Sequence, residues 1–135
     1  MAQFVLSDAF CSVAGVDLSD HVKSLTLNHG ADSVEKTVMS DTTHKFMGGL
    51  KVTSLDVEFA QDFASAKVDA TLFPLVGTTA AIIVRPDSAA VSATNPNFTF
   101  TGLLESYPPL GGSIGDEATV SVTFQTTTDL SRATS

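Results

Sequence analysis

Apolar and polar residues alternate with a period of two in several short stretches, the pattern of β-strands with one buried face. In the clearest stretch, A-T-V-S-V-T-F-Q at 118–125, an apolar set alternates with hydroxyls and one amide. The stretch T-S-L-D-V-E-F at 53–59 alternates in the same way and places Asp56 and Glu58 on its polar side. The patterns predict strands over 10–13, 24–28, 53–59, 80–85, 98–105 and within 116–128.

One segment has helical spacing instead. Val68, Leu72 and the pair at 75–76 recur at helical intervals, which predicts a helix within 64–76 that Asp62 or Ser65 could cap. Pro74 should end regular helix near Phe73, and Gly77 suits the following turn. The prediction is a single antiparallel β-domain over 1–135 with one packed helix, and a tail that frays from about 127.

The segment at 33–49, S-V-E-K-T-V-M-S-D-T-T-H-K-F-M-G-G, is too long for a tight hairpin turn. Its large apolar residues argue against disorder. It is therefore an extended hairpin arm, a segment lying on a partner, or an ordinary excursion folded onto its own domain. Next to it, Leu50 and Val52 are out of phase with the strand at 53–59, which indicates a bulge or a strand start near Thr53.

Composition narrows the function classes. Hydrophobic residues form 43% of the chain, enough for a core, and the single cysteine excludes an intrachain disulfide. The formal net charge of −8, with scattered single bases, argues against gripping nucleic acid by its phosphates. No apolar run approaches about 20 residues, so no membrane anchor is expected, and the first ten residues do not resemble a signal peptide.

Candidate chemistry is sparse. His21, His29 and His44 lack metal-ligand spacing, and no nucleophile-elbow motif occurs. Asp56 and Glu58 could form a carboxylate pair, but a hydrated acidic face explains them more simply. We therefore expect no catalytic site, no cofactor and no metal.

Five stretches, in order and spanning nearly the whole chain, resemble the major tail tube proteins of long-tailed double-stranded DNA phages, especially actinobacteriophages. The stretches are V-D-L-S-D-H-V-K-S-L-T-L-N from Val16, D-T-T-H-K-F-M-G-G-L-K from Asp41, V-D-A-T-L-F-P-L-V-G-T-T from Val68, V-R-P-D-S-A-A-V-S-A-T-N-P-N-F from Val84 and Y-P-P-L-G-G-S-I-G-D from Tyr107. The resemblance implies a β-sandwich or partly closed barrel with a flanking helix. It also implies hexameric rings that stack into a tube, through which DNA passes into the host without specific binding.

The resemblance further implies roles for particular residues. The segment at 33–49 would be an arm that reaches neighbouring subunits, and the contact residues we expect are Met39, Thr42, Thr43, His44, Lys45, Phe46 and Met47. The hydroxyl-rich strand faces would line the wet bore, and the residues we expect there are Thr26, Asn28, Asp56, Glu58, Thr119, Ser121 and Thr123. A bulk-solvent role for these faces is the simpler alternative.

The implied partners are further copies of the chain together with the tape measure, tail terminator and distal tail proteins, and the implied location is the virion tail, assembled in the host bacterial cytoplasm. Two alternatives stay open. The chain could be a minor virion protein of the same fold, such as a terminator or decoration subunit, or a monomeric β-sandwich module for adhesion or binding.

Overall fold

The computed structural model describes residues 3–135, so the first two residues of the expected domain lie outside the described residues. The chain is mainly antiparallel β-structure with one short helix, as predicted. The strands are β1 (Phe10–Val13), β2 (Val16–Asp17), β3 (Val22–Glu35), β4 (Phe46–Ala60), β5 (Thr79–Arg85), β6 (Asn97–Leu104), β7 (Thr119–Thr126) and β8 (Ser131–Ala133). The helical elements are η1 (Ser19–His21), α1 (Val68–Leu72) and η2 (Phe73–Leu75).

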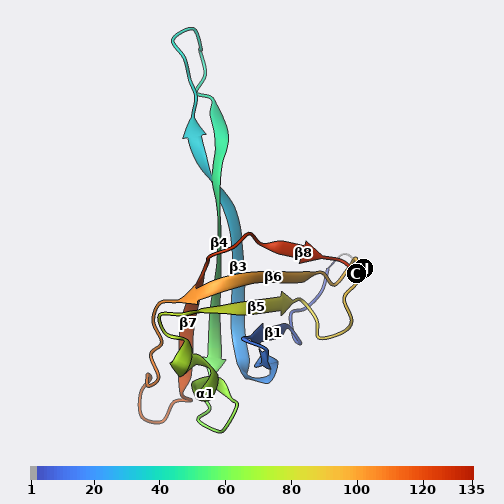
Figure 1. Ribbon diagram of the computed structural model, residues 1–135, viewed down its shortest axis with the longest axis vertical. Helices are drawn as coiled ribbons and strands as arrows, with labels where there is room; N and C mark the ends of the chain where they lie inside the picture. Colours follow the sequence, from blue (N-terminus) through green and yellow to red (C-terminus); the bar gives the residue numbers. More distant parts are fainter. Residues whose placement is uncertain (1–2) are drawn as a thin grey trace.

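The strands form one antiparallel sheet that does not close. Its order is β2-β1-β5-β6-β7-β4-β3, and β8 pairs with β6 outside this path. Figure 1 shows how the sheet folds over itself, with β5 and β6 crossing the layer formed by β3, β4 and β7. The core lies between these two layers, because the inward residues of each layer face the other.

The inward residues follow the period-two pattern of the sequence. The fully buried large side chains are Phe59, Phe124, Leu18, Leu55, Leu72, Ile82, Leu104, Val13, Val68 and Val120. Gly102 lies among them on β6, where a Cβ would come within 2.8 Å of Ile82 Cδ1. A methyl group at this position would therefore displace the Ile82 side chain.

The β3/β4 hairpin is much longer than the strands predicted at 24–28 and 53–59. The two strands stay paired from Val22↔Phe59 out to Glu35↔Phe46, and the hairpin projects well beyond the body of the molecule (Figure 1). A bulge is present where Asp32 faces Gly49 and Leu50 together, but the register is regular from Lys51 to Glu58, so this bulge does not explain the phase of Val52. The alternative start near Thr53 is wrong, because backbone pairing continues past the end of the buried face.

The helix is shorter than the predicted range of 64–76. It begins at Val68, because Ala66 takes a positive φ of 59°, a conformation that cannot continue a helix. Neither Asp62 nor Ser65 caps it, and Lys67 occupies the N-cap without a side-chain bond. Regular helix ends at Leu72, followed by the 3-10 turn η2 that contains Pro74. The glycine turn is as predicted, with Gly77 at φ 80°.

The expected fraying from about 127 is not observed at the tail. β8 pairs with the first residues of β6, through Asn97↔Ala133 and Thr99↔Ser131. Before it, the Thr127 N–H donates to the Thr101 carbonyl at 2.8 Å, and Leu130 packs against the core. The free edge of β6 therefore holds the tail, a long-range pairing that residue periodicity does not indicate.

Candidate self-assembly surfaces

The outer side of the β3, β4 and β7 layer carries a continuous polar surface, here called the polar face. Antiparallel register aligns its residues in three rows, which are Ser24–Glu58–Ser121, Thr26–Asp56–Thr123 and Asn28–Ser54–Gln125. Thr119 continues the β7 column beside Ala60. All the residues predicted to line a bore are thus brought together on one side of the sheet.

Hydrogen bonds order the centre of this polar face. The Thr123 hydroxyl donates to Asp56 Oδ1 at 2.7 Å, and Asn28 Nδ2 donates to Asp56 Oδ2 at 3.4 Å. Asp56 and Glu58 are the acidic residues of the three rows. Lys23, at the rim of the polar face, is paired with Glu117. The polar face is therefore hydrated and acidic, a surface that phosphate groups do not favour.

β3 forms one end of the strand order, and within residues 3–135 it pairs with β4 alone. The outer edge of β3 therefore presents backbone N–H and C=O groups along a long strand next to the polar face. Such an edge is a template for pairing with another chain. The polar face therefore lies beside a strand edge that is open for pairing.

The predicted arm at 33–49 is the distal part of the β3/β4 hairpin (Figure 1). Met39 is fully exposed at the tip, with 104% relative exposure. Phe46 and Met47, the first residues of β4, are exposed on opposite sides of the hairpin. Val34 and Val38, absent from the predicted contact set, add to the exposed apolar surface of the arm. Val34 could have been added to the predicted contact set, because it alternates with the polar residues Ser33 and Glu35.

Local polar contacts hold the arm tip in one shape. The Asp41 carboxylate accepts from the Val38 N–H at 2.9 Å and pairs with Lys45 Nζ at 2.9 Å, and its side chain is only 11% exposed. The hydrogen bond from Val38 and the one from Lys45 hold the pKa of Asp41 below its ordinary value. Thr42 and Thr43 are exposed beside this contact. The polar part of the predicted contact set thus supports the tip from which Met39 projects.

A second contact pairs the two strands just below the tip. His44 Nδ1 lies 2.6 Å from Glu35 Oε2, and the Thr37 hydroxyl donates to the same oxygen at 2.9 Å. The hydrogen bonds from His44 and Thr37 lower the pKa of Glu35. The arm is therefore an ordered hairpin up to its tip.

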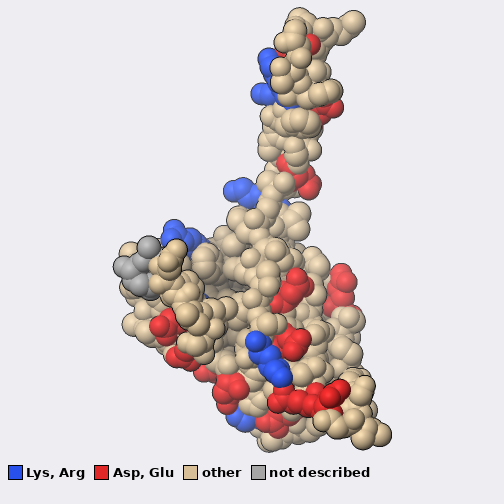
Figure 2. Space-filling model, turned by 180° about the vertical axis from the view of Figure 1, so that it is seen from behind, with Lys and Arg blue, Asp and Glu red and all other residues tan. Residues whose placement is uncertain are grey.

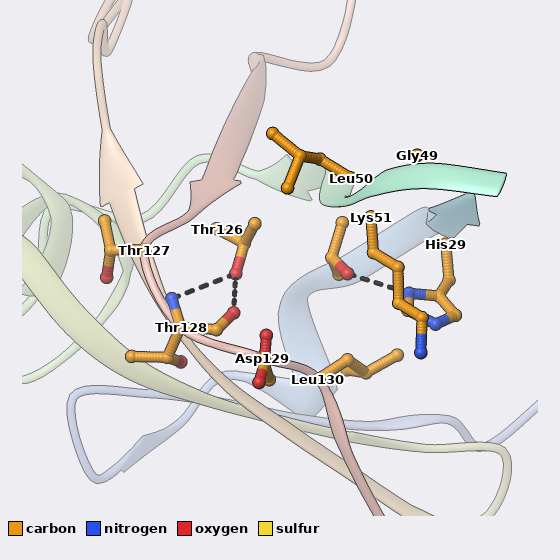
Figure 3. A pocket seen from close by; sticks show the side chains of 10 residues that line it. His29, Gly49, Leu50, Lys51, Thr126, Thr127, Thr128, Asp129 and Leu130 are labelled. Carbon is orange, nitrogen blue, oxygen red and sulfur yellow. Dashed lines mark hydrogen bonds between the residues drawn. The ribbon is translucent and has the colours of Figure 1, made fainter. Parts of the chain in front are cut away.

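A hollow of about 650 Å³ lies at the base of the arm, between the hairpin and the loop that joins β7 to β8. Figure 3 shows Leu50 and His29 on the hairpin side, facing the threonines at 126–128 and Leu130. His29 Nδ1 is bonded to the Thr53 hydroxyl at 2.9 Å. This hollow depends on the tail pairing, and no sequence pattern predicted it.

Across residues 3–135, no three His, Cys, Asp or Glu side chains are arranged to hold a metal ion. Cys11 is fully buried, and burial, with a smaller contribution from Asp17, raises its pKa to about 12. Over the same residues, no helix has the length and apolar character needed to span a membrane.

Sequence comparisons find no matching family model and no matching curated protein. Structure comparisons do find similar chains. A chain of the virion of a native gene transfer agent particle has a TM-score of 0.71 at 15% identity, over 93% of this chain and 95% of that chain. A chain of the tail of an empty gene transfer agent particle, refined with C6 symmetry, has a TM-score of 0.66 at 16% identity, over 82% and 81% of the two chains.

A third similar structure is the SPP1 tail tube, determined by solid-state NMR and electron microscopy. Its TM-score is 0.72 at 9% identity, over 95% of this chain and 77% of that chain. At such low identities the likeness lies in the path of the backbone and not in particular side chains. The chain therefore has the fold of the chains that make up the SPP1 tail tube and the gene transfer agent tail.

Proposed function

We propose that this protein is the structural subunit of a phage-type tail tube, polymerising as stacked hexameric rings. The observation that carries the proposal is the arm, an ordered hairpin that holds five large apolar side chains in solvent. These side chains are Val34, Val38, Met39, Phe46 and Met47. Holding that much apolar surface in water is unfavourable for an isolated subunit and favourable once a partner covers it.

The open sheet supports ring formation. The free edge of β3 can pair with a strand of the next copy. Such head-to-tail pairing forms a closed ring when the rotations between successive copies add up to a full turn. One of the similar structures is a tail with C6 symmetry, which supports a ring of six copies. Ring formation would place the polar faces of all copies side by side.

The polar face would then line the bore. Its hydroxyl and amide groups hold water, and Asp56 and Glu58 repel phosphate, so DNA would pass without binding. In this arrangement the arm reaches beyond its own ring to the next, and the tape measure, terminator and distal tail proteins would contact the bore and the ends of the tube.

The experiment that tests this proposal replaces residues 36–45 of the hairpin with a two-residue Asn-Gly turn. The shortened chain should keep the unfolding midpoint of the full chain, because these residues contribute nothing to the core. In sedimentation velocity, the full chain should form large assemblies while the shortened chain stays small. Large assemblies of the shortened chain would contradict the role of the arm.

A further inference from the structure

The end of the molecule opposite the arm carries a second set of exposed apolar side chains. β4 runs from the arm to Ala60, which pairs with Thr119, so the segments 61–78 and 105–118 both emerge at this far end (Figure 1). The large exposed apolar residues of these segments are Phe63, Phe73, Val76, Leu110 and Ile114. We call them the acceptor end.

A hydrogen-bond network holds the start of the 105–118 segment against α1. The Tyr107 hydroxyl donates to Asp69 Oδ1 of α1 at 2.8 Å, and Gln61 Nε2 donates to Tyr107 and to the Pro109 carbonyl at 2.9 and 2.7 Å. The network ties the start of the 105–118 segment to α1. Beyond it, Leu110 and Ile114 project at 81% and 107% exposure.

Charge is distributed unequally between the arm and the rest of the chain. The arm holds two acids and two bases, so the whole net charge of −8 lies on the remaining residues. The acceptor end is acidic, because its two segments hold Asp62, Asp69, Glu105, Asp116 and Glu117 against the single base Lys67. Red side chains gather at the end away from the arm in Figure 2. The acidic remainders of two copies repel each other, whereas an arm with no net charge can approach the acidic acceptor end of another copy.

We propose that the arm of one copy docks on the acceptor end of a second copy, with Met39 packed against Ile114 and Leu110. This inference rests on the proposed function and assigns the surface that the arm contacts. Donor and acceptor lie at opposite ends of one chain, so the contact is heterologous and propagates without closing. Apolar contact supplies the attraction, and the placement of donor and acceptor at opposite ends sets the polarity of stacking.

The experiment is site-directed cross-linking of assembled protein with a short bismaleimide. The test variant is Met39→Cys with Ile114→Cys, and the control is Met39→Cys with Asp129→Cys, which places the second thiol on the rim of the hollow at the arm base. The native Cys11 is fully buried and should not react. All substituted positions are exposed, so the variants should fold.

The test pair should give a ladder of dimers, trimers and larger species in gels, because every copy holds one donor and one acceptor. Its rate should exceed that of the control by about a hundredfold, since neighbouring thiols in an assembly have millimolar effective concentrations. Adding Leu110→Asp and Ile114→Asp to the otherwise unmodified chain should abolish assembly without changing the unfolding midpoint.

Three results would overturn the inference. A ladder from the control pair alone would place the arm in the hollow, and no ladder from either pair in assembled protein would place it elsewhere. Both results would leave the tube proposal standing. A native chain that sediments only as a monomer would defeat the proposed function and this inference together.

Discussion

At the residue scale, the tightest requirement of the core is the missing side chain of Gly102. A Cβ there would lie 2.8 Å from Ile82 Cδ1 and 3.1 Å from Phe124 Cβ, in a fully buried site. Close-packed interiors do not absorb an extra methyl group without moving neighbours. This glycine sets how closely β6 approaches β5 and β7.

Gly102→Ala should therefore lower the free energy of unfolding by about 1–3 kcal/mol, the usual cost of overpacking. Gly30→Ala is the matched control, because nothing lies within 4 Å of a Cβ built there. Urea unfolding of both variants measures the difference. Equal stability of the two variants would show that the layers can separate to admit the methyl group.

His21 is a titratable group that joins two parts of the chain. Its Nδ1 lies 2.8 Å from Asp20 Oδ1 and its Nε2 lies 2.8 Å from Asp62 Oδ2. Burial alone would lower the pKa of His21, but the hydrogen bonds to Asp62 and Asp20 outweigh it and the pKa is raised. Protonated His21 thus favours the folded state.

Because the folded pKa exceeds the unfolded value of about 6.5, the stabilisation is fully present below that pH and is lost as pH rises through the folded pKa. His21→Gln should lower the free energy of unfolding more at about pH 5.5 than at about pH 9. Urea unfolding at both values tests this. An equal loss at the two values would mean that the ion pairs contribute no stability.

At the scale of elements, the sequence indicated strands wherever one face is buried. The strands at 10–13, 80–85 and 98–105 agree with β1, β5 and β6 to within one residue at each end. The outer half of the β3/β4 hairpin could not be predicted in this way, because neither of its faces is buried by its own chain. Its apolar residues signalled contact and left its secondary structure open.

The start of α1 and the strand β8 were missed for different reasons. The start of α1 depends on the positive φ of Ala66, which an alanine does not signal. β8 depends on pairing with β6, a distant edge, and its short sequence has no periodicity. The polar face was largely predictable, since Thr26, Asp56 and Thr123 alternate with buried residues, but its alignment into rows required the register.

The arm tip offers a prediction about an element alone. Asp41→Ala removes the acceptor for the Val38 N–H and the partner of Lys45. A loss of about 1 kcal/mol of local order should speed hydrogen exchange at Val38 about fivefold. The unfolding midpoint should stay unchanged, because the tip lies outside the core.

Ser40→Ala, at an exposed neighbour, is the control for this variant. NMR-detected exchange of the Val38 amide gives the measurement. Unchanged exchange in Asp41→Ala would mean that the tip is held by pairing of the strands alone.

At the scale of the whole molecule, the proposed assembly uses different surfaces for different contacts. Exposed apolar residues lie on the arm and at the acceptor end, with others at the base of the arm and in the segment before β1. The free edge of β3 lies at one side of the sheet, and the acidic polar face lies beside that edge. In the proposed tube, these surfaces would let one chain join a ring, stack on the next ring and line the bore with its polar face.

The acidic character of the polar face has a testable consequence. Asp56→Lys with Glu58→Lys changes the net charge from −8 to −4 and makes the polar face basic. This variant should bind short double-stranded DNA at low salt, with affinity that falls as salt rises, whereas the native chain should not. Fluorescence anisotropy of labelled DNA measures it.

The control for this variant, Asp8→Lys with Asp129→Lys, makes the same change of charge at exposed positions away from the polar face. It should bind DNA more weakly, because its lysines are isolated from one another. Equal DNA binding by the two variants would mean that binding depends on net charge and not on whether the lysines lie on the polar face.

If this fold is completed by copies of itself, electron microscopy of the purified native chain should show it. Long hollow tubes are expected, whose end-on views have six-fold symmetry and an open centre. A uniform field of single, compact particles at every protein concentration would contradict it.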